Sequence, residues 1–132
     1  MVIIDPQQEL FTEILIECKK HFGANNVFDG AMPSNTTPYP FVYIGDSQLV
    51  DNTLKDIVIG NVHQIIHVWS NNPLKRGDVS KMLLDIKNIC RKISKTSNLI
   101  WVVKHVNQRI LPDNTTKAPL LHGVLEVEFA FY

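Results

Sequence analysis

The sequence predicts an α+β fold: a two-layer sandwich in which a mainly antiparallel, four-stranded sheet carries two amphipathic helices on one face. Two stretches place apolar residues at helical spacing, and four others have the composition or alternation of strands, in the order α-β-β-α-β-β. Each helix has one apolar stripe to bury, which a sheet beneath it can cover. The chain of 132 residues is long enough for one core, so we expect a single domain over residues 1–132.

The first helix is predicted to begin at Asp5 and Pro6. An aspartate side chain accepts a hydrogen bond from a free amide of the first turn, and proline has no amide to leave unpaired there. Gly23 can adopt the left-handed conformation that closes the last turn. Apolar residues recur at helical spacing between these ends: Leu10, Phe11, Ile14, Leu15, Cys18 and Phe22.

The segment from residue 24 to residue 60 contains one clear strand. Residues 24–40 are rich in Asn, Pro, Ser and Thr, which predicts a loop. A short strand at 41–44 is predicted to end at Gly45 and Asp46. For residues 46–60 two possibilities stay open: a strand near 55–59, or a long loop that becomes ordered against a partner.

Residues 60–70 are predicted to form the central strand. Two sets of side chains alternate along it, with Val62, Gln64, Ile66 and Val68 on one face and His63, Ile65, His67 and Trp69 on the other. Because both faces carry apolar side chains, we expect both faces to be covered, with Trp69 filling the joint between layers.

The second half of the chain predicts a helix and two strands. The helix spans residues 78–93, with Asp78 as its N-cap. The strands at 99–111 and 120–132 are predicted to pair antiparallel. The connection at 112–119 is rich in turn residues but longer than a tight hairpin turn, so we expect it to project from the sheet.

Composition narrows the class of protein. The formal net charge of zero argues against a nucleic-acid-binding protein that relies on many phosphate contacts. Acidic residues nevertheless dominate residues 1–66, and basic residues dominate residues 67–117. With no bilayer-spanning apolar run and no export signal, we expect a soluble, unexported protein without a membrane partner. Cys18 and Cys90 lie among apolar residues of separate helices, which predicts buried, reduced thiols.

The histidines predict no metal site. His63 and His67 share a strand face but would lie about 13 Å apart, too far to bind one ion. The remaining histidines add no ligand at close sequence spacing, and no catalytic or phosphate-binding motif occurs. We therefore predict no catalytic residue, no metal and no cofactor.

The two helices carry complementary charges beside their apolar stripes. The acidic stripe consists of Glu9, Glu13 and Glu17, and the basic stripe of Lys87, Arg91 and Lys95. If the helices are neighbours on the sheet, the stripes face each other within one chain, where exposed pairs add little stability. If they emerge on opposite flanks, the stripes of two chains can bind each other in a head-to-tail contact.

Two short motifs carry a resemblance to a known family. They are Tyr39-Pro40-Phe41-Val42-Tyr43-Ile44-Gly45 and residues 63–70 with the helix that follows them. With the order of elements, they resemble the tail-completion, or tail-to-head joining, proteins of long-tailed (siphovirus-type) bacteriophages. The resemblance covers most of the chain and implies a structural virion protein, not an enzyme.

The resemblance also implies partners and a location. Six copies would form a ring at the head-proximal end of the tail tube, ending the tail and joining it to the head connector. The implied partners are other copies of the chain, the tail tube protein and the neck (stopper) protein. DNA would cross the ring without specific binding, which suits a neutral chain. The protein would be assembled in the bacterial host cytoplasm and reside in the virion.

Within that ring, we expect the sheet to be a rigid platform and the loops to make the contacts. The loops in question are residues 24–39, 46–60 and 111–119. The predicted interface residues in the second loop are Asp51, Lys55 and Asp56. Subunits could also stay monomeric until the tube end supplies a template, since ordering these loops costs entropy.

Two alternatives remain. One is an intracellular α+β adaptor that self-associates through a sheet edge or through its last strand. The other is a small hydrolase or metal-dependent enzyme that uses His63, His67, His105 or Glu126. Glu126 shares a strand face with Glu128, an arrangement that a solvent-exposed sheet face explains without catalysis.

Overall fold

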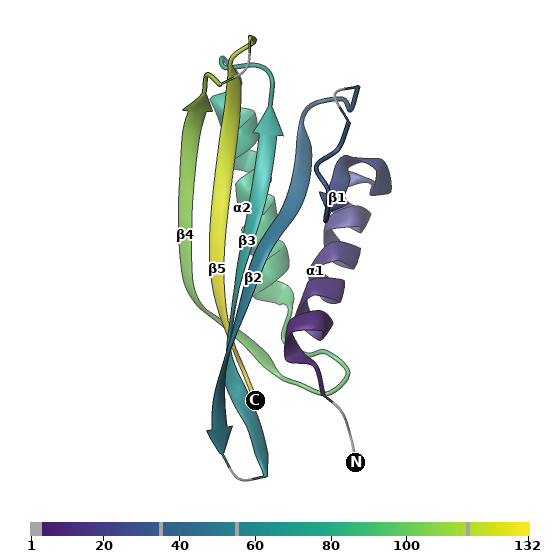
Figure 1. Cartoon of the computed structure of the whole chain (residues 1–132), viewed down its shortest axis with the longest axis vertical. Coiled ribbons are helices and arrows are strands. Elements are labelled where there is room, and N and C mark those ends of the chain that lie inside the picture. Colours follow the sequence, from purple (N-terminus) through teal and green to yellow (C-terminus); the bar gives the residue numbers. More distant parts are fainter. Residues whose placement is uncertain (1–3, 35, 55, 116) are drawn as a thin grey trace.

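Two helices cover one face of a five-stranded sheet in the computed structural model, which describes residues 4–34, 36–54, 56–115 and 117–132 (Figure 1). The elements are α1 (Pro6–Phe22), a 3-10 turn (Ala24–Asn26), β1 (Val27–Asp29), β2 (Phe41–Leu54), β3 (Ile57–Ser70), α2 (Arg76–Lys92), β4 (Trp101–Asp113) and β5 (Leu120–Phe131). Within these described residues, no helix combines the length and apolar character needed to span a membrane.

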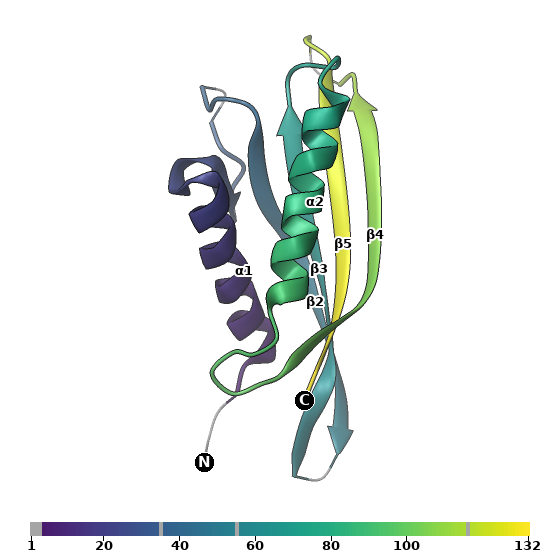
Figure 2. The same ribbon diagram turned by 180° about the vertical axis from the view of Figure 1, so that it is seen from behind.

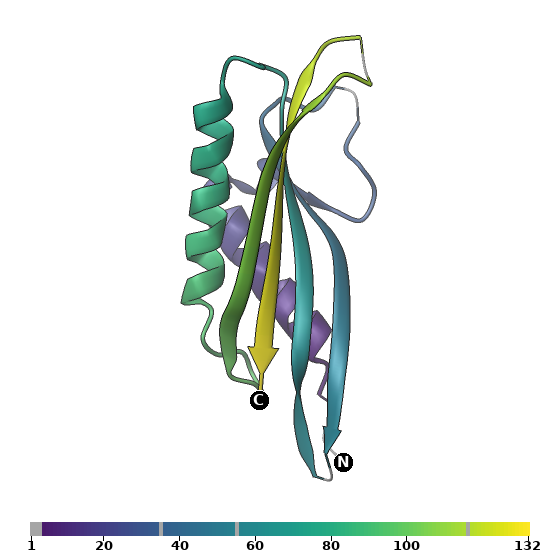
Figure 3. The same ribbon diagram turned by 90° about the vertical axis from the view of Figure 1, so that its left-hand side faces the viewer.

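The predicted α+β class is confirmed, with both helices on the same face of an open sheet (Figures 2 and 3). The strand order is β1-β2-β3-β5-β4, and all neighbours are antiparallel except β1, which pairs parallel with β2. The prediction of four strands was wrong, because β1 lies inside the segment predicted to be a loop. Three residues are too few to show an alternating pattern, and the strand is defined by its parallel pairing with β2.

The start and end of α1 are confirmed. Asp5 Oδ1 accepts a hydrogen bond from the amide of Gln8 at 3.1 Å. Gly23 has φ 96°, and its amide donates to the carbonyl of Lys19. The predicted start of α2 was wrong: the helix begins at Arg76, and Asp78 lies in its first turn, where a carboxylate is favoured by the helix dipole.

The strand predicted to end at Gly45 continues to Leu54. A bulge between Ile44 and Ser47 interrupts the register with β3, after which pairing resumes. The buried side chain of Gln64 holds this bulge, because its Nε2 donates to the carbonyls of Gly45 at 3.1 Å and Asp46 at 3.2 Å. Residues 47–54 therefore pair with residues 57–64 in a hairpin, which decides between the two possibilities left open by the sequence.

Only one face of β3 is covered by helices. Val62, Ile66 and Val68 point toward the helices and are fully buried, whereas Ile65 and Trp69 are half-buried on the opposite, helix-free face. The prediction that both faces are covered was therefore wrong. Trp69 does not fill the joint between layers but stacks on His122, with ring centroids 3.7 Å apart. Cross-strand stacking shields the ring without a second layer.

The core lies between the helices and the inner sheet face. Strands β4 and β5 pair antiparallel as predicted. Their inward side chains pack against the apolar stripes of both helices in one cluster, whose members include Leu10, Ile14, Leu83, Ile86, Trp101, Leu125, Phe129 and Phe131. This layer fixes the sheet as a platform, so the surfaces available for binding are its flanks, its helix-free face and its projecting hairpin.

Candidate interaction surfaces

The hairpin joining β2 and β3 projects beyond the rest of the sheet. Strand β5 pairs with β3 only as far as the contact between Gly60 and Phe131. Beyond it, the β2–β3 ladder continues alone from Asp51, opposite Gly60, to Leu54, opposite Ile57. We call residues 51–54 and 56–59 the arm; Figures 1 and 3 show it extending past the ends of the other strands.

The arm is both apolar and acidic. Ile57 is 54% exposed and Val58 43% exposed, although both are large apolar side chains. Asp51 and Asp56 are also exposed, and Asp56 occupies the hairpin turn with φ 68°. The predicted interface residues Asp51 and Asp56 are thus on the surface of the arm, whereas Lys55 lies outside the described residues.

The opposite flank of the sheet is basic. Strand β4 is the edge strand there, and between it and α2 lies an open hollow of about 540 Å³. Its lining combines two cations with apolar side chains: Arg91, Trp101, Val102, Val103, Lys104 and Val106. Lys87, one helical turn before Arg91, extends the charge along the same side of α2. We call Lys87, Arg91 and Lys104 the basic flank.

Sequence reasoning missed Lys104. This residue lies where the pairing of β4 with β5 shifts, between Val103 and His105. A bulge of this kind changes the direction in which a side chain points, so strand alternation gives no signal for it.

Glu9 of the acidic stripe is bound within the chain. Its carboxylate accepts hydrogen bonds from Thr96 Oγ1 at 2.7 Å, Asn98 Nδ2 at 2.8 Å and the amide of Asn98 at 3.2 Å. Burial opposes the ionisation of Glu9, but the hydrogen bonds from Asn98 and Thr96 outweigh it and lower its pKa. Glu9 therefore anchors the loop between α2 and β4.

The rest of the acidic stripe faces the groove between the helices. Glu13 and Glu17 line this groove together with Lys92 and Lys95. Lys95 thus lies beside the acidic stripe of its own chain, whereas Arg91 lies on the other side of α2. The helices are neighbours, and the predicted basic stripe is split between two surfaces. An intersubunit role for Glu13 and Glu17 remains a prediction.

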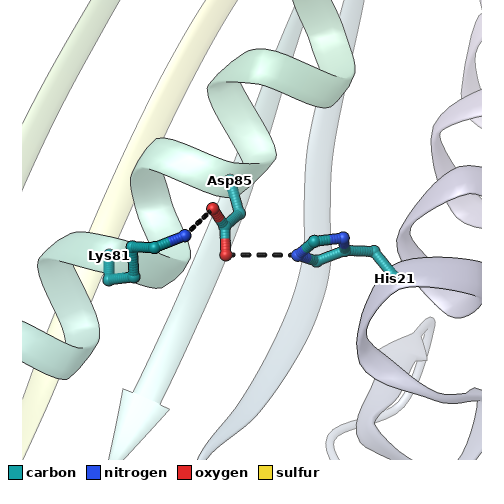
Figure 4. A network of polar contacts seen from close by, with 3 residues as sticks. All are labelled: His21, Lys81 and Asp85. Carbon is teal, nitrogen blue, oxygen red and sulfur yellow. Dashed lines mark hydrogen bonds and ion pairs between the residues drawn. The ribbon is translucent and has the colours of Figure 1, made fainter.

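A second polar contact joins the two helices. Asp85 of α2 lies between His21 of α1 and Lys81 of its own helix, as Figure 4 shows. His21 Nε2 is 3.1 Å from Asp85 Oδ2. The hydrogen bond from Lys81 is the main cause of the lowered pKa of Asp85, and His21 adds to it. This network fixes the groove side of α2 against α1.

Replacing Glu9 with alanine is expected to lower the free energy of unfolding by about 1–2 kcal/mol, because three hydrogen bonds to the loop are lost. Glu13→Ala, in the same helix, should change it by less than about 0.5 kcal/mol. Chemical denaturation of both variants measures the difference. Equal effects would show that Glu9 has no special role in the loop.

The helix-free face carries a stacked pair of histidines that the sequence did not predict. His67 Nδ1 lies 2.7 Å from His122 Nε2, so one ring donates to the other. Burial, reinforced by the charge of His67, lowers the pKa of His122 to about 4, and burial also lowers the pKa of His67. The pair is therefore held in its neutral form.

This pair predicts that stability decreases in mild acid. Below about pH 6.5 the unfolded histidines bind protons that the folded pair resists, so the loss develops as the pH falls toward about 4. After allowance for partial exposure, we expect a loss of about 1–2 kcal/mol. Denaturation at several pH values should show it in the wild type and in the His63→Gln control, but much less in His122→Gln. An unchanged decline in His122→Gln would contradict the assignment.

The described residues contain no group of three His, Cys, Asp or Glu side chains placed to bind a metal ion. His63 and His105 are exposed on the helix-free face, and Glu126 lies 3.9 Å from Arg109 in an ion pair. Of the residues named for the enzyme alternative, His63 and His105 lie opposite Glu128 on either side of β5, whereas His67 is hydrogen-bonded to His122.

The two cysteines are buried and free, as predicted. Burial raises the pKa of Cys18 to about 12 and raises that of Cys90 as well.

The last strand is not a sheet edge. Strand β5 lies between β3 and β4, so it cannot provide the strand pairing that the adaptor alternative assigned to it. The edges available for pairing are β4 on one side and, beyond the short β1, the outer side of β2 on the other.

Compared by sequence, the chain matches no protein-family model and no curated protein. Compared by structure, it is similar to a chain from the virion of a native gene transfer agent particle, with a TM-score of 0.65 and 12% identity over 96% of this chain and 93% of that one. A second solved structure, described only by an identifier, has a TM-score of 0.60 and 11% identity over 97% of both chains. At such identities the likeness establishes a shared fold.

Proposed function

We propose that this chain is a structural component of a phage-like particle. More specifically, it forms a ring, of six copies, at the head-proximal end of a tail tube. There it ends the tube and joins the tail to the head connector. Its partners are other copies of itself, the tail tube protein and the neck (stopper) protein, and its work is binding, not catalysis.

The observation that carries the proposal is the likeness to a chain of a gene transfer agent virion. This likeness extends over nearly the whole of both chains. The two chains therefore share the complete arrangement of helices and sheet, and not merely a supersecondary motif that many folds contain. The motifs at residues 39–45 and 63–70 resemble the tail-completion family independently of that comparison.

The surface of the chain suits this role. A rigid two-layer body carries the projecting arm at one end of the sheet and the β4–β5 connection at the other (Figure 1). Contacts at both ends would let one ring hold the tube on one side and the head on the other. The zero net charge lets DNA pass the ring without strong phosphate binding.

The experiment is deletion of the gene from the phage genome that carries it, followed by electron microscopy of the lysate. We expect separate filled heads and separate tails of normal or greater length, with joining restored by the gene supplied in trans. Intact infectious particles in the deletion strain would contradict the proposal.

A further inference from the structure

We infer that the arm of one copy binds the basic flank of a second copy, with Asp51 and Asp56 of the arm beside Arg91 and Lys104 of the neighbour. The inference rests on the proposed function, since it names the two surfaces through which copies of the ring meet. It differs from the contact between helix stripes, in which Glu9 cannot take part because it is bound within its own chain.

The arm has the properties of a segment that needs a partner. It is a two-stranded ladder without a third strand, and such a hairpin is marginally stable in water by itself. Val50, Ile57 and Val58 are each at least 43% exposed, and alternate residues place apolar groups on both of its faces. A neighbouring surface that covers the arm would remove this apolar area from water.

The basic flank has an unpaired strand edge and an apolar hollow, both of which could bind the arm. Strand β4 has one edge paired with β5; on its other edge the amide of Trp101 donates to the carbonyl of Ser94, and beyond Trp101 the described part of the chain places no strand there. An unpaired edge can accept a further extended segment through its backbone groups. Beside this edge, the apolar side chains of Trp101, Val103 and Val106 line the hollow that an apolar hairpin could enter.

The charges of the two surfaces are complementary. Residues 51–59 contain two aspartates and one lysine. On the flank, Arg91 and Lys104 are exposed and make no ion pair among the described residues. On the neighbouring strand β5, Glu126 pairs with Arg109 and Glu128 lies opposite His105. Arg91 and Lys104 therefore remain available to the aspartates of another chain.

The positions of the surfaces suit a ring. Trp101 pairs with Phe131, and Phe131 pairs with Gly60, so the hollow beside the start of β4 lies at the arm's end of the sheet. The arm and the flank belong to different strands on different sides of β5. A contact between unlike surfaces repeats from copy to copy and closes when the rotation permits.

Photo-crosslinking in assembled particles tests the contact directly. Particles are produced with Val58→p-benzoylphenylalanine, and with Ile16→p-benzoylphenylalanine as a control that is equally exposed, at 43%, on α1. We expect Val58 to yield dimers of the chain whose crosslinked peptides map to residues 87–109, and Ile16 to yield none there.

The outcomes separate the two proposals. Absence of the chain from purified particles overturns the proposed function and, with it, this inference. Presence of the chain with Val58 crosslinked to a different protein, or to another region of the second copy, overturns the inference alone.

Charge exchange provides a second test. The arm variant combines Asp51→Lys with Asp56→Asn, because asparagine tolerates the φ of 68° at the turn. The flank variant combines Arg91→Glu with Lys104→Glu. Each variant alone should fail to join heads and tails, while both expressed together should restore joining, because they can alternate in an even-membered ring. Thermal melting first establishes that both variants are folded. Joining of heads and tails by either variant alone would then overturn the inference, and so would a mixture that joins no better than the single variants.

Discussion

Replacing Gly60 with valine is expected to lower the free energy of unfolding by at least about 3 kcal/mol, the largest effect of any single substitution considered for this chain. A Cβ at this position would clash with the carbonyl oxygen of Val50 and lie 2.8 Å from Cζ of Phe131. The first contact is with backbone of the paired strand, which cannot move without opening the ladder. Gly60 is also where the arm leaves the sheet, so the strain would fall at its base.

Gly77→Ala is the matched control. No atom lies within 4 Å of a Cβ built at this helical position, so we expect no loss and a gain of up to about 1 kcal/mol. Thermal unfolding of both variants measures the contrast, and Gly60→Val should melt about 10 °C or more below the wild type. Similar melting temperatures for the two variants would show that the sheet yields easily at Gly60.

Removing the arm is expected to abolish head–tail joining while leaving the fold intact. Replacement of residues 52–59 by an Asn-Gly turn would close the hairpin directly after the pair formed by Asp51 and Gly60. No described residue of the removed segment belongs to the core cluster, so the melting temperature should change by only a few degrees. Infectivity should fall to the level of the gene deletion, because each copy then lacks the surface that binds its neighbour.

Ile16→Ser serves as the control for loss of exposed apolar area. Ile16 is 43% exposed and lies on α1, outside both the arm and the basic flank. Plaque titre and electron microscopy of both variants are the measurements. Normal joining without the arm would exclude it as the contact between copies, and failed joining by Ile16→Ser would show that the assay responds to any surface change.

The helices and the last two strands could be predicted because their signals are local. Caps such as Asp5 and Gly23 act within one turn, and the apolar spacing of each helix reflects burial on one side. The bulge of β2 could not be predicted, because the amide group that holds it belongs to Gln64, on the neighbouring strand. A hydrogen bond between the carbonyls of the bulge and a donor on another strand leaves no pattern in either stretch of sequence.

The candidate surfaces were predicted in part for the same reason. Asp51 and Asp56 were identified from composition, and the structure places them on an exposed hairpin. The role of Glu9 was not predictable from its spacing, because its partners Thr96 and Asn98 lie 87 and 89 residues away. Spacing finds charges that share a helix face, but only the fold shows which of them are already bound.

The burial of both native cysteines makes the surface of this protein easy to label. Maleimides react with accessible thiolates, and Cys18 and Cys90 offer neither access nor an ionised sulfur near neutral pH. A cysteine engineered at any exposed position should therefore be modified selectively, without first removing the natural ones. Spin labels or fluorophores attached in this way could report subunit spacing while the interior remains that of the wild type.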